Sequence, residues 1–114
     1  MIRRDEIYLA SFPFGDSAGM KLRPVLTITG PLGRVPEVLV AYISSVIPDQ
    51  LMPSDILLDP SKSEFAATKL KTASVLRLHK MATIHGRNIV RRLGELSPAT
   101  ISAVDERLRS LLDL

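Results

Sequence analysis

Short apolar runs, separated by proline and glycine, dominate most of the chain. The strongest have the length of a β-strand and span residues 7–12, 25–29, 38–43, 56–58 and 74–83. Residues 38–43 are apolar throughout, which is typical of a strand buried on both faces. A turn-rich loop over residues 13–19 is expected to lead into Lys21-Leu22-Arg23-Pro24. The pattern predicts a β-rich fold with residues 38–43 at its centre.

A single helix is predicted at the carboxy-terminal end. Ser97 suits the N-cap, and Pro98 suits the first helical position, where an N–H would have no partner. Apolar residues then recur at helical spacing at Ile101, Val104, Leu108, Leu111 and Leu112. Because no helix pattern follows each strand, parallel βαβ units are not expected. The predicted fold is mainly β with α: a small, partly open β-barrel of antiparallel strands with a C-terminal helix.

Composition limits the class of protein. The chain has 114 residues and is 46% hydrophobic, so residues 1–114 are expected to form one domain around one core. The absence of cysteine excludes disulfides and thiolate metal sites. The sequence contains no signal-peptide core and no stretch near the roughly 18 apolar residues of a membrane span. A cytoplasmic protein without a membrane partner is expected.

Positive charge is concentrated late in the chain. The net charge is only +3, but residues 69–92 contain no Asp or Glu while carrying Lys69, Lys71, Arg77, Lys80, Arg87, Arg91 and Arg92. A segment of one sign can follow a phosphate backbone, because clustered cations displace condensed counterions. The alternative is a solvated basic face.

Most standard catalytic patterns are missing. The sequence has no cysteine nucleophile, no glycine-rich phosphate loop, no HExxH motif, and only two histidines. The remaining cations, hydroxyls and one well-placed imidazole suit RNA cleavage, in which the substrate's 2′-OH is the nucleophile. The protein then needs a base, an acid and fixed donors for the phosphorane. No cofactor and no metal are expected.

Three residues at predicted strand ends are candidates for phosphate contact. The guanidinium of Arg23 can hold a phosphate bidentately. Ser44 and Ser45 close the central apolar run, where a hydroxyl can bond a phosphate oxygen or satisfy a turn. The alternative for Arg23 is a surface ion pair with Asp5, Glu6 or Asp16.

Arg77 and His79 are two residues apart in a predicted strand, so they are expected to project side by side, opposite Leu76 and Leu78. A neighbouring guanidinium lowers the pKa of an imidazole, which favours a neutral base near pH 7. The alternative is an ordinary exposed basic strand. His85 is interpreted as a turn residue.

Taken in order, several segments resemble the MazF/PemK toxins nearly end to end. The most specific pair is Arg23-Pro24-Val25-Leu26 followed by Ile43-Ser44 at a strand end. Further matching segments are Asp5-Glu6-Ile7-Tyr8-Leu9, Phe12-Pro13-Phe14, Ser74-Val75-Leu76-Arg77-Leu78, Ala82-Thr83-Ile84, Gly94-Glu95-Leu96-Ser97 and Val104-Asp105.

The resemblance implies an SH3-like barrel that works as a homodimer. It also implies a metal-independent, sequence-specific endoribonuclease toxin that cleaves single-stranded RNA and is inhibited by a cognate antitoxin protein. The expected products are a 2′,3′-cyclic phosphate and a 5′-OH. Contact with operator DNA is expected only through the antitoxin complex.

Carried over by position, the family's functional residues fall on Arg23, Ser44 and Arg77. In one branch an acidic residue with a part in proton transfer stands where this chain has His79. The expected catalytic residues are therefore Arg23, Ser44 and His79, or Arg23 and Ser44 suffice and His79 only contacts RNA. The expected RNA-binding residues are Lys21, Ser45, Arg77 and Lys80.

Two other functions stay open. A related toxin family with this fold inhibits DNA gyrase, and a silent barrel could bind RNA without cutting it. Low aromatic content, 4% with no Trp, favours the nuclease over an inhibitor that presents an aromatic epitope. RNA is expected to lie in a groove between two protomers, where residues 16–20 and 61–71 would set sequence preference. An acidic, disordered antitoxin segment would compete for that groove.

Overall fold

The computed structural model describes residues 1–12 and 21–114, with only the backbone of Phe12. The loop expected over residues 13–19, the specificity segment 16–20 and Asp16 therefore lie outside the described residues. Within the described part, the strands are β1 (Glu6–Phe12), β2 (Lys21–Thr27), β3 (Glu37–Ser44), β4 (Asp55–Leu58), β5 (Ser74–His85) and β6 (Ile89–Glu95). Two short 3-10 helices, η1 (Ser63–Thr68) and η2 (Gly86–Asn88), precede the α-helix α1 (Pro98–Leu111).

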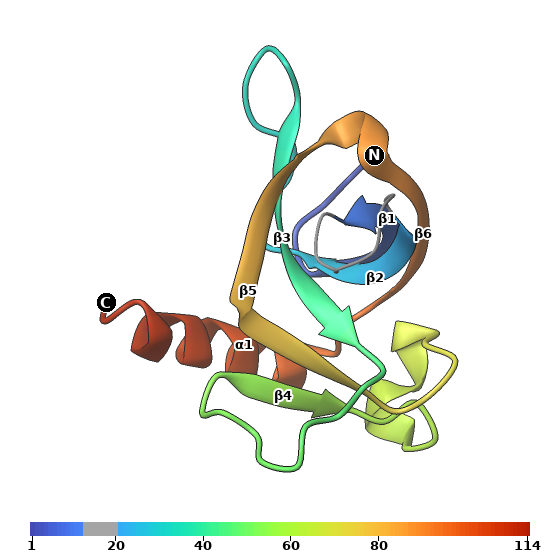
Figure 1. The fold of residues 1–114 in the computed structure, drawn as a ribbon, viewed down its shortest axis with the longest axis vertical. Helices are drawn as coiled ribbons and strands as arrows, with labels where there is room; N and C mark the ends of the chain where they lie inside the picture. The colour runs from blue at the N-terminus through green and yellow to red at the C-terminus, as the bar shows by residue number, and fades with distance from the viewer. Residues whose placement is uncertain (13–20) are drawn as a thin grey trace.

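The strands form one antiparallel sheet in the order β4-β5-β3-β2-β1-β6, which curls around itself (Figure 1). The predicted class, mainly β with α, is confirmed. In the described residues β4 and β6 are the two edges, so the sheet is an open barrel rather than a closed one. β3 lies in the interior of the sheet between β5 and β2, as its continuous apolar run predicts.

Two sequence predictions about strands were wrong. The strand expected over residues 25–29 is β2, which begins at Lys21 and ends at Thr27. β6 was not predicted, because residues 89–95 read IVRRLGE, with adjacent arginines and a glycine in place of a regular alternation. Pairing with β1 supplies the hydrogen bonds that make this segment a strand.

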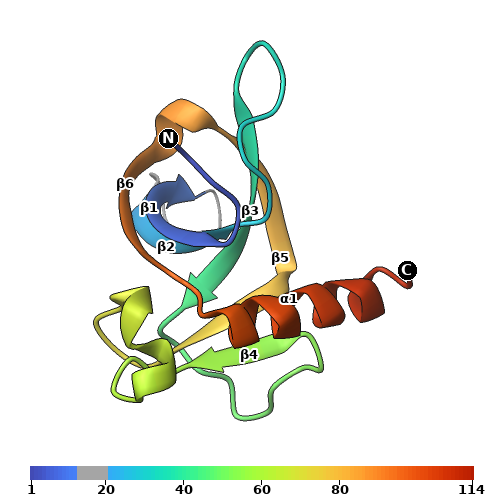
Figure 2. The same ribbon diagram turned by 180° about the vertical axis from the view of Figure 1, so that it is seen from behind.

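The C-terminal helix has the predicted start. The Ser97 hydroxyl accepts a hydrogen bond from the Thr100 amide, and Pro98 is the first helical residue. Val104 enters the core with Leu76 and Leu78 of β5, and Ile101 and Leu108 pack against it. Figure 2 shows α1 crossing β5 and running beside β4. The helix thus covers one end of the curled sheet.

A large irregularity bends β5. Ala41 of β3 pairs with Met81, but the next residue, Tyr42, pairs with Arg77. The intervening residues of β5, which include His79, therefore have no partner in β3, and the strand turns sharply at this point (Figure 1). Bulges redirect side chains and are common beside functional sites.

Gly94 fixes the position of η1 against β6. A Cβ at this residue would lie 2.2 Å from the Ala67 carbonyl oxygen and 2.4 Å from that of Thr68. Only glycine permits this close approach of two backbones. The contact fixes where the chain leaves η1. The segment that follows begins with Lys69, which has the left-handed conformation at φ 58°.

Candidate functional site

A pocket of about 510 Å³ opens between the ends of β2 and β3, the segment that follows η1, and β6. Its apolar lining includes Leu9, Tyr42, Leu70 and Leu93. Its polar lining residues are Arg23, Ser44, Ser45, Lys69, Lys71, Thr72, Ser74 and Arg91, with no Asp or Glu among the described residues that line it. We call it the Arg23 pocket; it combines apolar surface with one sign of charge.

Arg23 lies in β2, directly before Pro24, and is half-buried. Its expected alternative was an ion pair with a nearby carboxylate. Asp5 pairs instead with Arg4, and Glu6 pairs with Arg92 at 2.6 Å. Within residues 1–12 and 21–114 the Arg23 guanidinium has no ion-pair partner. It is therefore a half-buried cation with donors to spare in a pocket.

Ser44 and Ser45 join Arg23 in the lining. The Ser44 hydroxyl accepts a hydrogen bond from the Val46 amide at 3.1 Å and lies 3.3 Å from the Val46 carbonyl oxygen, to which it donates. The turn role that was the alternative for Ser44 is thus present. It also fixes the hydroxyl at the pocket wall, where a rotated O–H can donate a hydrogen bond to a ligand oxygen and the second lone pair can accept one from a ligand donor.

Three further cations in the lining, Lys69, Lys71 and Arg91, were not singled out as site residues by sequence reasoning. They belong to the basic segment 69–92. The charge pattern therefore included them but did not distinguish them from the other cations of that segment. All three are exposed and have no ion-pair partner in the described part of the chain. The pocket therefore gathers four unpaired cations.

Arg77 and His79 project from β5 toward Asp55 of β4 rather than into the Arg23 pocket. The predicted side-by-side arrangement is seen, with Leu76 and Leu78 fully buried on the other side. Arg77 donates from Nε to Oδ1 of Asp55 at 3.2 Å and from Nη2 to Oδ2 at 3.4 Å. His79 Nδ1 lies 3.8 Å from Asp55 Oδ1. We call Asp55, Arg77 and His79 the Asp55 cluster.

Sequence reasoning missed Asp55. Its side chain has no exposed surface, whereas a lone Asp at the start of a short apolar run usually lies at the surface. Its charge partner is 22 positions away along the chain, so only the β4–β5 pairing brings the two residues together.

Burial lowers the pKa of the His79 imidazole, and the neighbouring Arg77 charge lowers it further, while the Asp55 carboxylate acts in the opposite direction. The lowering predicted from Arg77 is confirmed in direction, although desolvation is the larger cause. A lowered pKa keeps His79 neutral near pH 7 and able to accept a proton.

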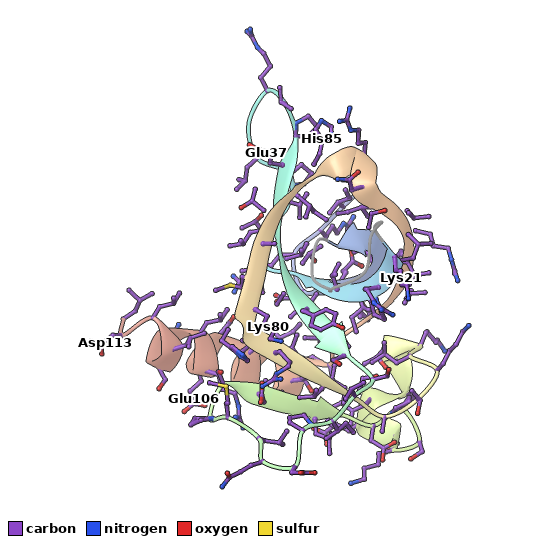
Figure 3. The ribbon with its side chains drawn as sticks, viewed as in Figure 1. Lys21, Glu37, Lys80, His85, Glu106 and Asp113 are labelled. Carbon is purple, nitrogen blue, oxygen red and sulfur yellow. The ribbon has the colours of Figure 1, made fainter. Side chains whose placement is uncertain are left out.

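Lys21 and Lys80, the other expected RNA contacts, do not line the Arg23 pocket. Lys21 opens β2 and pairs with Phe12 of β1, whereas Lys80 lies at the bend of β5 (Figure 3). The Lys80 ammonium is 6.0 Å from the centre of the Tyr42 ring, and Tyr42 lines the pocket and pairs with Arg77. Tyr42 thus lines the Arg23 pocket and is also the β3 neighbour of Arg77 in the Asp55 cluster.

His85 ends β5, and its Nδ1 accepts a hydrogen bond from the Arg87 amide, in agreement with a turn role. The described residues contain no group of three or more His, Cys, Asp or Glu side chains placed to hold a metal ion. Within the same residues, no helix is long and apolar enough to cross a membrane.

An open antiparallel barrel with a C-terminal helix and a pocket of unpaired cations and hydroxyls defines a small protein suited to binding a phosphodiester chain. The family model for the PemK-like, MazF-like toxins of type II toxin-antitoxin systems matches residues 3–112. The chain therefore belongs to this family. The expectation of a toxin endoribonuclease is confirmed at the level of the family.

Curated relatives match along the whole chain. Endoribonuclease MazF2 of Mycobacterium bovis is 31% identical over 118 aligned positions, which cover 100% of this chain and 99% of the relative. Endoribonuclease MazF6 of Mycobacterium tuberculosis gives the same identity and coverage.

Solved structures share the fold. The Mycobacterium tuberculosis toxin MazF-mt6 aligns with a TM-score of 0.72 at 24% identity, covering 96% of this chain and 97% of that one. An endoribonuclease from a mycobacterial species, solved in complex with its cognate antitoxin, aligns with a TM-score of 0.70 at 17% identity, covering 100% and 97%.

Proposed function

We propose that this toxin is a metal-independent endoribonuclease that cleaves single-stranded RNA at short sequences, using the substrate's 2′-OH as the nucleophile. The products are a 2′,3′-cyclic phosphate and a 5′-OH. The observation that carries the proposal is the Arg23 pocket, in which a half-buried, unpaired guanidinium lies with the hydroxyls of Ser44 and Ser45 and three more unpaired cations.

The pocket suits a phosphorane better than it suits a neutral ligand. As the 2′ oxygen attacks phosphorus, negative charge grows on the non-bridging oxygens. Fixed donors aimed at that charge lower the barrier most in a partly desolvated site. Arg23 supplies a planar pair of N–H donors, and Ser44 orients the phosphate through its hydroxyl.

His79 is proposed as the base. Its imidazole takes the 2′-OH proton as the bond from the 2′ oxygen to phosphorus forms and the bond to the 5′ oxygen breaks. The leaving 5′ oxygen takes a proton from water to become a hydroxyl. The lowered pKa of His79 supports this role. His79 does not line the Arg23 pocket, so the scissile nucleotide would have to lie across Tyr42, which lines the pocket and pairs with Arg77.

Lys69, Lys71 and Arg91 are proposed to hold phosphates that flank the scissile one. Their exposure and lack of carboxylate partners in the described residues suit contacts that release counterions. Lys21 and Lys80, outside the pocket, would extend the same track. Ser45, next to Ser44 in the lining, would contact the same phosphate.

The cognate antitoxin is proposed to cover the same pocket. An acidic peptide with apolar side chains would pair with the four cations and place its apolar groups against Leu9, Leu70 and Leu93. Bound antitoxin would make these cations unavailable to RNA without changing the fold.

We also propose that the toxin is a cytoplasmic homodimer and that RNA lies in a groove between the two protomers. Light scattering on the purified toxin tests the dimer.

The function is tested by incubating end-labelled single-stranded RNA with the toxin in excess chelator and determining the chemistry of the new ends. Cleavage that leaves 2′,3′-cyclic phosphates, and that stops when the scissile nucleotide is 2′-deoxy, is expected. Chelator-sensitive cleavage would contradict the mechanism. A folded toxin that cuts none of a varied set of RNAs would favour a gyrase-type inhibitor or a silent RNA-binding barrel.

A further inference from the structure

Asp55 is a buried carboxylate held from several directions. Its Oδ2 accepts a hydrogen bond from the Met52 amide at 2.8 Å, and Arg77 bonds both of its oxygens. Arg107 of α1 donates to the Asp55 carbonyl oxygen at 3.0 Å. Because its side chain is 0% exposed, Asp55 cannot touch RNA. Any effect it has on a reaction must pass through a neighbour.

His79 is the neighbour with an unmet hydrogen bond. Its Nδ1 is buried and has no hydrogen-bond partner, and Asp55 Oδ1 lies 3.8 Å from it. The side chain as a whole is 24% exposed, so the accessible part of the ring lies away from Nδ1. A separation of 3.8 Å is too long for a hydrogen bond, but contacts of this kind are often long in a free enzyme and tighten around substrate.

We propose that Asp55 is a positioning residue for His79: its carboxylate accepts a hydrogen bond from Nδ1–H and thereby leaves Nε2 as the proton acceptor. This inference rests on the proposed RNA cleavage, in which the 2′-OH proton passes to Nε2. Which ring nitrogen carries the proton in a neutral histidine is set by the hydrogen bond that the other nitrogen makes. When Nε2 takes the proton, the Asp55 charge stabilises the imidazolium.

The charged groups around His79 make this arrangement testable. Arg77 and Lys80 of β5 oppose protonation of the imidazole, and Asp55 of β4 favours it. Arg107 of α1 donates its hydrogen bond to the backbone carbonyl oxygen of Asp55, not to the carboxylate. Replacing Asp55 by the isosteric Asn removes the attraction and leaves the repulsion. The pKa of His79 should then fall further.

The test combines nitrogen NMR of histidine-labelled toxin with single-turnover cleavage. The chain has two histidines, so the His85→Gln variant assigns the His79 signals. We expect the Nδ1–H tautomer in the wild type and, in Asp55→Asn, a lower His79 pKa. The cleavage rate of Asp55→Asn at saturating RNA should fall at least about 10-fold while KM changes less than about 3-fold. Asp49→Asn, at an exposed residue of the β3–β4 connection, is the matched control and should change none of these.

An Nε2–H tautomer in the folded wild type, or a His79 pKa that Asp55→Asn leaves unchanged, would overturn the proposal. The wild-type tautomer decides the question even where Asp55→Asn fails to fold. A toxin that cuts no RNA yet shows the Nδ1–H tautomer and the Asp55-dependent pKa would overturn the proposed nuclease and leave the positioning of His79 standing. A nuclease with the Nε2–H tautomer would overturn the positioning alone.

Discussion

The Arg23 pocket and the Asp55 cluster both gather basic side chains, but they differ in whether a carboxylate neutralises the charge. In the cluster a buried carboxylate holds Arg77 by two hydrogen bonds and lies beside His79. In the pocket Arg23, Lys69, Lys71 and Arg91 have no carboxylate partner among the described residues. Cations that have no partner within the fold are available to bind a polyanion, whereas cations paired with a carboxylate stabilise the protein's own structure. The contrast supports the proposal that the pocket cations hold RNA phosphates, while Asp55 holds Arg77 and orients His79, the proposed base.

Arg23→Ala should have the largest effect on activity. Removing one donor from a charge-stabilising site costs about 10²- to 10³-fold in rate, and we expect that loss in single-turnover RNA cleavage. Because Arg23 has no ion-pair partner in the described structure, the melting temperature should change little. The matched control is Arg34→Ala, at an exposed residue outside the pocket, which should retain activity. A fully active Arg23→Ala variant would remove the distinction between the two regions.

Asp55→Leu should show the reverse signature, with a loss of stability. It leaves Arg77 without its partner, and breaking such a pair costs about 2–3 kcal/mol, less than a wholly buried pair because Arg77 keeps 17% exposure. Urea unfolding measures the change. The double variant Asp55→Leu with Arg77→Met should recover part of the loss, because no charge is then stranded. Equal stability of the wild type and Asp55→Leu would mean that the cluster does not stabilise the fold.

Lys69→Ala, Lys71→Ala and Arg91→Ala should each weaken RNA binding with little change in the cleavage step. Each phosphate contact on a single strand contributes a slope of about 0.7 to the dependence of log affinity on log salt concentration. Binding of a 2′-deoxy oligonucleotide across a salt series should show a slope that is lower by about this amount in each variant. Lys62→Ala, exposed and outside the pocket lining, is the control. Unchanged slopes would mean that these cations do not meet phosphates.

The smallest effect expected is a pH dependence that follows from the lowered pKa of His79. An unfolded histidine titrates at about 6.5, whereas the partly buried imidazole of His79 beside Arg77 resists protonation. Cleavage should therefore persist below pH 6.5 and decline only as pH falls through the lower folded value. Stability should decrease earlier, as the pH falls from about 6.5 to that lower folded value, because the unfolded chain binds the proton first. The acid limb should disappear in His79→Gln and stay in His85→Gln.

Local patterns predicted five of the six described strands, the helix cap and the alternation that brings Arg77 beside His79. Features that depend on distant pairing escaped prediction. β6 owes its existence to β1 rather than to its own residues, and Asp55 is buried only because β4 pairs with β5. The bend that leaves His79 outside the β3 register also has no sequence signature. Lys69, Lys71 and Arg91 belong to the basic segment that the sequence singled out. The structure is needed to show that these three cations share a pocket with Arg23, because the position of η1 depends on its close contact with Gly94.

The most direct test of the contrast is an amide NMR titration of the toxin with a single-stranded RNA whose scissile nucleotide is 2′-deoxy, so that it binds without being cut. The largest shifts should fall on the Arg23 pocket, at Arg23, Ser44, Ser45 and residues 69–72. Unmoved pocket amides, with the shifts concentrated elsewhere on the sheet, would contradict this prediction.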